Sequence, residues 1–176
     1  MQNIKLVRPT KELEKAAIDF KNEFFQNGEY EINGSELWDK TDSYDIWLEN
    51  VTKNSCKETV NPNWVVTDTF FAVRECDNHI IGIIDFRNEL NDFLKDFGHC
   101  GYSVRPTERK KGYATEMLKQ IIDLARQIGL KEMQLSCVSD NEPSVKTITN
   151  NGGIYQRSFL YEEKKADIFL IKPESV

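Results

Sequence analysis

The chain has 176 residues, of which 30% are charged and 39% are hydrophobic, and its formal net charge is -6. This composition is typical of a globular protein and argues against disorder. The length predicts a single domain over residues 1–176. The acidic balance, 29 acidic against 23 basic residues, argues against nucleic acid as a partner, because a phosphate backbone requires a basic face. A cationic, amine-bearing substrate is compatible with this balance.

Neither a membrane segment nor a metal site is expected. The longest apolar runs, such as Ile80 to Ile84, are only a few residues long. The first residues lack the apolar centre of a signal peptide, so we expect a cytoplasmic protein. The chain contains only two histidines, and its cysteines form neither a C-x-x-C pair nor a metal-ligand cluster. They are widely scattered, at Cys56, Cys76, Cys100 and Cys137.

The N-terminal third predicts one strand and two helices. Ile4 to Val7 alternates as a strand does. Apolar residues at helical spacing from Leu13 to Phe24 then predict a helix that ends near Gly28. Apolar residues between Tyr44 and Val51 indicate a second, short helix. The stretch from Thr52 to Asn63 is rich in Asn, Ser and Thr and is expected to be a loop.

The middle of the chain predicts a hairpin and a third strand. Strands are expected at Thr69 to Arg74 and at Ile80 to Phe86, joined by the polar turn Glu75 to Asn78. A loop from Asn88 to Phe97 then leads to a strand over Gly98 to Val104.

The most informative stretch follows this strand. Apolar residues recur at steps of three and four from Ala114 to Ile128, which predicts an amphipathic helix. Its first N–H groups would lack intrahelical partners and carry partial positive charge. Gly112 would let a ligand approach the backbone closely. The preceding loop holds four cationic side chains, Arg105, Arg109, Lys110 and Lys111. A phosphate site is the interpretation we favour, and a solvated basic turn is the alternative.

The C-terminal part predicts one more helix and a closing hairpin. Gly129 can end the long helix, and a strand is expected over Glu132 to Val138. A short helix over Ser144 to Asn150 precedes two strands, Ile154 to Leu160 and Ala166 to Ile171. Strands joined by helices, followed by a terminal hairpin, predict an α/β sheet with mixed strand directions.

Two motifs in this order resemble a known family. Arg109-Lys110-Lys111-Gly112-Tyr113-Ala114 resembles the Arg/Gln-x-x-Gly-x-Gly/Ala signature of the GCN5-related N-acetyltransferases (GNAT family), and Asn141-x-x-Ser144 resembles their Asn-x-x-Ala/Ser. The G-x-x-x-x-G-K-[ST] loop of nucleotide hydrolases is absent. The resemblance covers roughly Ile80 to Leu170. It implies a GNAT-like mixed, mostly antiparallel central sheet flanked by helices on both faces, in which two parallel strands, 98–104 and 133–138, splay apart.

The resemblance also implies a cofactor and a place for it. Acetyl-coenzyme A would lie in the wedge between the splayed strands, with the backbone at Val104 pairing with its pantetheine arm. Asn141 and Ser144 would contact the pantetheine or the adenosine end. The pyrophosphate would be bound by a run of seven residues: Arg109, Lys110, Lys111, Gly112, Tyr113, Ala114 and Thr115. Residues 80–170 would form the cofactor-binding core, and residues 1–63 would border the acceptor site.

The acid and the base of the reaction are less defined. A free alkylamine has a pKa of about 10 and must lose a proton before it attacks. Many family members protonate the departing thiolate with a tyrosine seven positions after the asparagine, but that position here is Ile148. Tyr102, Tyr155 or water could replace it, or the thiolate could leave unassisted. His99 has a suitable intrinsic pKa for a base, although a strand histidine is more often structural.

Other base and nucleophile candidates remain open. Asp96 and Glu89 precede the strand on which the family often places a carboxylate base. A covalent acetyl-cysteine at Cys137 is a further alternative, although no histidine lies near it in the sequence.

The sequence therefore predicts an acetyl-coenzyme A dependent N-acetyltransferase acting on a primary amine of a small molecule or peptide, by direct attack on the thioester. One alternative is a catalytically inactive acyl-coenzyme A sensor or interaction module, which the isoleucine at position 148 favours. A second is an α/β domain with an incidental basic loop. Homodimers are common among similar proteins, and the edge of the closing hairpin could pair with a second copy.

Overall fold

The chain folds into two antiparallel sheets flanked by helices, and the structure, a computed structural model, describes residues 2–175. The first sheet has the order β1-β2-β3-β4, formed by β1 (Ile4–Val7), β2 (Thr67–Arg74), β3 (His79–Arg87) and β4 (Tyr102–Val104). The second has the order β5-β7-β6, formed by β5 (Met133–Val138), β6 (Ile154–Tyr161) and β7 (Lys164–Ile171). The helices are α1 (Glu14–Gln26), α2 (Tyr44–Asn54), α3 (Tyr113–Gln127) and α4 (Glu142–Asn150).

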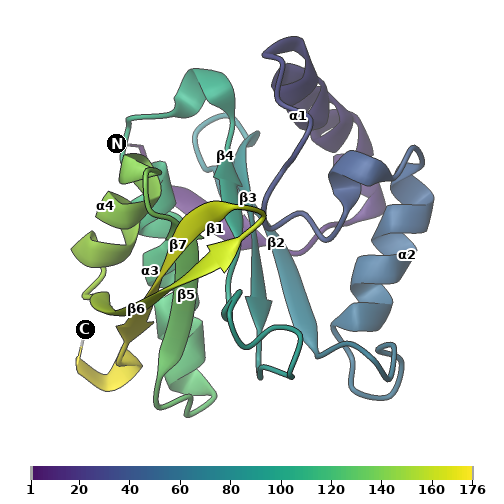
Figure 1. The fold of residues 1–176 in the computed structure, drawn as a ribbon. Helices are drawn as coiled ribbons and strands as arrows, with labels where there is room; N and C mark the ends of the chain where they lie inside the picture. Colours follow the sequence, from purple (N-terminus) through teal and green to yellow (C-terminus); the bar gives the residue numbers. More distant parts are fainter. Residues whose placement is uncertain (1, 176) are drawn as a thin grey trace.

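Helices cover both faces of the first sheet, which confirms the predicted α/β class. Figure 1 shows α1 and α2 on one side of the molecule and α3 and α4 on the other. Ile81 and Ile84 of β3 belong to the core cluster that includes α3, whereas Ile80 and Ile83 belong to the cluster that includes α1 and α2. Residues three positions apart normally lie on opposite faces of a strand. Here each pair lies on one face, because a register shift in the β2–β3 pairing interrupts the alternation of side chains.

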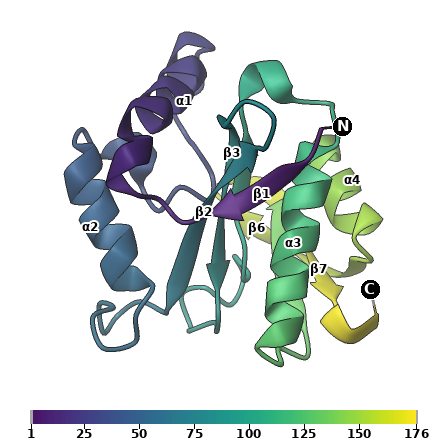
Figure 2. The ribbon, with the colours of Figure 1, turned by 180° about the vertical axis from the view of Figure 1, so that it is seen from behind.

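The strand β1 closes the edge of the first sheet beside α3. Seen from behind, the two elements lie side by side (Figure 2). The Gln120 side chain of α3 donates to the Ile4 carbonyl at 3.1 Å and accepts from the Leu6 N–H at 3.3 Å. The long amphipathic helix is confirmed, and Gly129 follows its end in the left-handed region, at φ 77°.

The strand predicted over Gly98 to Val104 is regular only over its last three residues. Pairing with β3 continues upstream through Asp85 N to Gly101 O at 3.0 Å and Arg87 N to His99 O at 2.7 Å. The Gly101 N–H, however, donates to the Asp85 carboxylate at 2.5 Å, and Gly98 has a φ of 84°. These two departures interrupt the regular ladder.

The two sheets meet at one point and separate beyond it. The bridge between them joins Gly98 and Leu135 and is antiparallel in type. A Cβ on Gly98 would lie 2.5 Å from the Gln134 carbonyl oxygen, so this approach requires glycine. Within residues 2–175 no ladder joins β4 to β5. The facing edges of β4 and β5 are therefore unpaired beyond this bridge, as the resemblance implies, and we call the region between these two edges the wedge.

Other predicted boundaries shift by a few residues. The helix α2 extends to Asn54, and α4 begins at Glu142 because Asn141 caps it. Among the residues that the structure describes, no helix has both the length and the apolar character to cross a membrane.

Candidate functional site

The loop between β4 and α3 places a helix N-terminus at the mouth of the wedge. Gly112, the residue preceding the helix, has a φ of 85°, and Lys110 has a φ of 61°. Both lie in the left-handed region, which glycine adopts readily and lysine adopts at a cost. Gly112 has no side chain that could cap the helix, so the first turn stays open to a ligand.

The main-chain N–H groups of this loop are available to an anion. For residues 110–115, the backbone N–H groups have no hydrogen-bond acceptor within the described part of the chain. Consecutive free N–H groups at a helix start carry partial positive charge and bind phosphate. These groups fit the diphosphate of coenzyme A.

The cationic side chains of the loop are mostly paired with carboxylates of the protein. Arg109 binds Glu29 through two contacts of 2.7 and 2.6 Å, and its Nε donates to the Val104 carbonyl at 3.1 Å. Lys111 Nζ lies 2.9 Å from Glu108. The ion pair with Arg109 lowers the pKa of the Glu29 carboxyl. The fit to a diphosphate therefore rests on the main chain more than on these two side chains.

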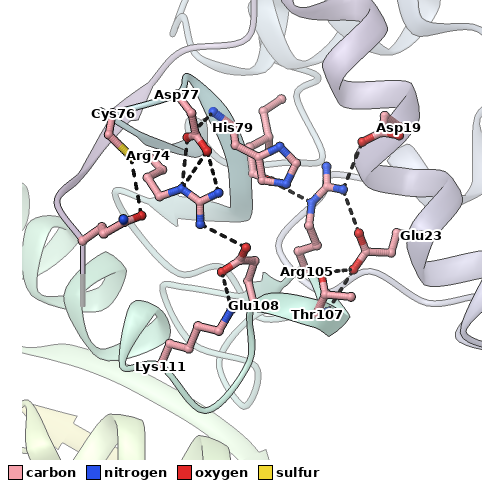
Figure 3. A network of polar contacts seen from close by, with 12 residues as sticks. Asp19, Glu23, Arg74, Cys76, Asp77, His79, Arg105, Thr107, Glu108 and Lys111 are labelled. Atoms are coloured by element: carbon pink, nitrogen blue, oxygen red, sulfur yellow. Dashed lines mark hydrogen bonds and ion pairs between the residues drawn. The ribbon is translucent and has the colours of Figure 1, made fainter.

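Arg105 fixes the loop instead of facing a ligand (Figure 3). Its side chain is buried, and its Nε donates to the Ile80 carbonyl at 2.9 Å. The guanidinium also contacts Asp19 at 3.0 Å and Glu23 at 2.7 Å. Glu23 in turn accepts from the backbone and the hydroxyl of Thr107, at 2.9 and 2.8 Å. Burial raises the pKa of Glu23, but these bonds outweigh it and lower the pKa overall.

A second carboxylate in Figure 3 ties the loop to the β2–β3 hairpin. Glu108 is buried and lies 3.0 Å from Arg74, while its other oxygen accepts from Lys111. Arg74 also pairs with Asp77 in the hairpin turn, at 2.7 Å. The loop is therefore held both by α1 and by the β2–β3 hairpin.

The backbone of β4 offers a donor to the wedge. The Arg105 N–H donates to the Ile81 carbonyl, and the Asp85 N–H donates to the Gly101 carbonyl. The residues of this strand that are hydrogen-bonded to β3 are therefore the odd-numbered ones. Val104, opposite Gly82, lies between these pairs, so its N–H points away from β3. This is the direction that pairing with an extended ligand in the wedge would need.

The Tyr102 side chain of β4 reaches the first turn of α4, where Asn141 and Ser144 lie. The Tyr102 hydroxyl lies 2.8 Å from the Ser144 hydroxyl, and the Asn141 side chain accepts from the Ser144 N–H at 3.2 Å. Burial raises the pKa of Tyr102, so its hydroxyl keeps its proton at neutral pH. Burial also raises the pKa of Cys137, which does not favour a nucleophilic thiolate.

His99 and Tyr155 do not join this group. His99 is 7% exposed, and its Nδ1 accepts from the Gln134 N–H at 3.0 Å, which places it in the contact between the two sheets. Tyr155 is 53% exposed on β6, and its hydroxyl lies 3.0 Å from that of Ser158. Ile148 is buried in the core against Gly153, so this position supplies no acid.

A loop for which the sequence predicts no helix or strand packs against β4. A Cβ on Gly34 would lie 2.2 Å from the Gly101 carbonyl oxygen, and the Ser103 hydroxyl donates to the Asn33 carbonyl at 2.9 Å. Glu36 follows with a φ of 48°. No periodicity marks this segment, because these contacts are distant in sequence. Among residues 2–175 no cluster of three metal-ligating side chains occurs.

Comparison with known proteins connects this geometry to one family. Residues 5–154 match the family described as the acetyltransferase (GNAT) domain. No curated protein matches the sequence.

Solved structures of acetyltransferases share the fold. The microcin C7 self-immunity acetyltransferase MccE, in complex with acetyl-CoA and AMP, is 16% identical with a TM-score of 0.70, over 96% of this chain and 92% of that one. A spermidine N-acetyltransferase SpeG chimera from Vibrio cholerae and hSSAT is 14% identical with a TM-score of 0.66, over 98% and 97%. RimL, a ribosomal L7/L12 alpha-N-protein acetyltransferase in complex with coenzyme A, is 13% identical with a TM-score of 0.67, over 98% and 95%.

Proposed function

The chain belongs to the GNAT acetyltransferase family, and we propose that it transfers an acetyl group from acetyl-coenzyme A to a primary amine of a small molecule or peptide. The observation that carries this proposal is the run of unpaired main-chain N–H groups at residues 110–115 within the described part of the chain. Similar structures contain acetyl-CoA or coenzyme A. A diphosphate held at this helix start would direct the rest of the molecule along the wedge.

Residues of the chain would then orient the reacting groups. Acetyl-coenzyme A would supply a thioester, whose carbonyl carbon an amine can attack. The N–H of Val104 points into the wedge and would donate to the pantetheine arm or to the carbonyl oxygen as negative charge develops there. Tyr102 retains its proton and is the candidate acid whose hydroxyl lies between β4 and α4. Tyr155 and His99 remain less favoured predictions, because neither contacts this group.

The bonds made and broken define what must be measured. The amine nitrogen bonds to the acetyl carbon and the carbon–sulfur bond breaks. The amine loses one proton and the departing thiolate gains one, so the products are an amide and a free thiol. Similar structures belong to enzymes named for spermidine and for a protein N-terminus. Both acceptors present a primary amine, which is the acceptor class that we propose.

Thiol release from acetyl-coenzyme A across a panel of amines tests the proposal. The panel should include spermidine, short peptides with a free N-terminus and lysine. We expect acceptor-dependent release with at least one of them. Binding of coenzyme A without release for any amine would instead favour the catalytically inactive sensor.

A cytoplasmic location and a homodimer formed through the β6 edge also remain part of the proposal.

A further inference from the structure

The loop from Ile32 to Trp38 lies against β4 at the point where the wedge opens. Gly34 contacts the backbone of Gly101 so closely that a Cβ there would lie 2.2 Å from the Gly101 oxygen. The Trp47 indole donates to the Ser35 carbonyl at 2.7 Å, which fixes the loop to α2. The segment is therefore held in place from β4 and from α2.

Glu36 is placed in this loop with an unusual backbone conformation. Glu36 and Leu37 have φ values of 48° and 64°, a left-handed pair that non-glycine residues adopt at an energetic cost. The Glu36 carboxylate accepts from the Asn54 side chain of α2 at 3.1 Å. Such strain is retained where the surrounding structure imposes it, and it is frequent at catalytic sites.

Two charged side chains of β3 act on Glu36. Asp85 and Arg87 form an ion pair of 2.7 Å, and Asp85 also accepts the Gly101 N–H. Burial raises the pKa of Asp85 as well, and the negative charge of ionised Asp85 adds to the effect of burial on Glu36. Burial and then Asp85 raise the pKa of Glu36 to about 7, against the opposing effects of Arg87 and the Asn54 bond. A carboxyl group that titrates near neutrality can accept a proton in catalysis.

We propose that Glu36 is the general base of the transfer reaction and takes the proton from the acceptor amine beside Gly101. This inference rests on the proposed function. As the amine nitrogen bonds to the acetyl carbon, one N–H bond breaks, an O–H bond forms on the Glu36 carboxylate, and the carbon–sulfur bond opens to release the thiolate.

The structure disfavours Asp96 and His99, two of the base candidates that the sequence suggests. Asp96 is ion-paired with Arg157. The Nδ1 of His99 already accepts the Gln134 N–H, and burial lowers the pKa of His99. Glu36 is half-buried, and its loop packs against Gly101 and β4.

The experiment compares Glu36→Gln with wild type and with Glu49→Gln, an exposed glutamate of α2. We measure kcat at saturating acetyl-coenzyme A and amine from pH 5.5 to 9, and coenzyme A affinity by calorimetry. Wild type and Glu49→Gln should lose about tenfold in kcat per unit of pH below a pKa near 7. Glu36→Gln should bind coenzyme A normally and lose about 100-fold in kcat. Its kcat should also no longer fall on the acidic side of the profile, the part that we call the acidic limb.

A second variant keeps the proposal testable if Glu36→Gln does not fold. Asn54→Ala removes a hydrogen bond that favours the charged carboxylate, so the limb of the kcat profile should move to higher pH. A merely structural role for Glu36 would leave the limb in place. The proposal is overturned if Glu36→Gln retains both the limb and a kcat within about threefold of wild type. Wild type that binds coenzyme A but turns over no amine would overturn the proposed function and this inference together.

Discussion

Gly112 is the residue on which the proposed anion site depends most directly. Its φ of 85° places it in the left-handed region directly before α3, within the run of N–H groups that have no acceptor in the described part of the chain. Gly129, at the other end of the same helix, has a φ of 77°, and no atom lies within 4 Å of the position that a Cβ would take there. The two glycines therefore carry the same conformational demand, and only one of them adjoins the proposed diphosphate.

Replacing each glycine by alanine separates strain from binding. Both Gly112→Ala and Gly129→Ala should lower the free energy of unfolding by about 1 kcal/mol, because each places a Cβ in the left-handed region. Only Gly112→Ala should weaken coenzyme A binding, by about tenfold, since it moves the N–H groups that hold the diphosphate. Calorimetric titration of both variants is the measurement. Equal affinities would argue that the loop does not hold the ligand.

Arg105 should be the most important cation of the loop for stability. Arg105→Met leaves Glu23 without its buried partner, so we expect a loss of about 2 kcal/mol in the free energy of unfolding. Arg157→Met removes an exposed pair with Asp96 and should cost about 0.5 kcal/mol or less. Urea denaturation at pH 7 compares them. Similar losses in both variants would contradict the structural role of Arg105.

The same pair of residues makes a prediction about acid. The folded-state pKa of Glu23 is below its ordinary value of 4.5, so its stabilising contribution is present above that pH and is lost as the pH falls below it. The difference in the free energy of unfolding between wild type and Arg105→Met should therefore shrink between about pH 4.5 and pH 3. A deficit that stays constant over this range would show that Glu23 is not the partner that matters.

At the scale of elements, the contact between the two sheets depends on His99. Its neutral imidazole accepts the Gln134 N–H, and its backbone N–H donates to the Gln134 carbonyl at 2.8 Å. Burial lowers the pKa of His99 below its ordinary value of 6.5. The unfolded chain therefore binds this proton first as the pH falls, and the stabilisation is complete above pH 6.5 and lost below it.

His99→Leu should destabilise the protein by about 1–3 kcal/mol at pH 7.5, because the Gln134 N–H loses its acceptor. The difference in the free energy of unfolding between wild type and His99→Leu should be smaller at about pH 5.5, where wild type has lost part of the stabilisation. His79→Leu, at the half-buried start of β3, should cost less at the higher pH. Urea midpoints at the two pH values measure these differences. A deficit for His99→Leu that grows as the pH falls would contradict this assignment.

Local pattern is sufficient to predict most elements and to mark the loop before α3 as a candidate anion site. The apolar spacing of α3 and the glycine before it are encoded within a few residues of each other, so periodicity and the motif identified both. The regular part of β4 was overestimated, because the role of Asp85 in binding the Gly101 N–H is a contact between strands that no local pattern shows.

Long-range pairs were the part of the site that the sequence could not supply. Arg109, for which the resemblance implies pyrophosphate binding, pairs with Glu29, which lies 80 positions away. Likewise the neighbours of Glu36 come from β3 and α2. Charge partners set by tertiary folding leave no mark on spacing, so the sequence identified the cationic loop but not which of its side chains are already paired.

At the scale of the whole molecule, the proposed cofactor and acceptor sites are connected through one segment. Glu23 and Glu29, at the end of α1 and just after it, pair with Arg105 and Arg109 of the loop that we propose to bind the cofactor. The chain then continues into the loop that carries Glu36. The proposed diphosphate site follows β4, and the loop of the proposed base packs against the same strand. In this proposal the second sheet would supply the opposite wall of the wedge.

The most direct test of the central claim is calorimetric titration of the purified protein with coenzyme A and, separately, with pantetheine, which lacks the diphosphate. We expect saturable, one-to-one binding of coenzyme A in the micromolar range and binding of pantetheine at least about 100-fold weaker, because main-chain N–H groups at the start of α3 hold the diphosphate. No uptake of coenzyme A at millimolar concentration, or equal affinity for the two ligands, would contradict it.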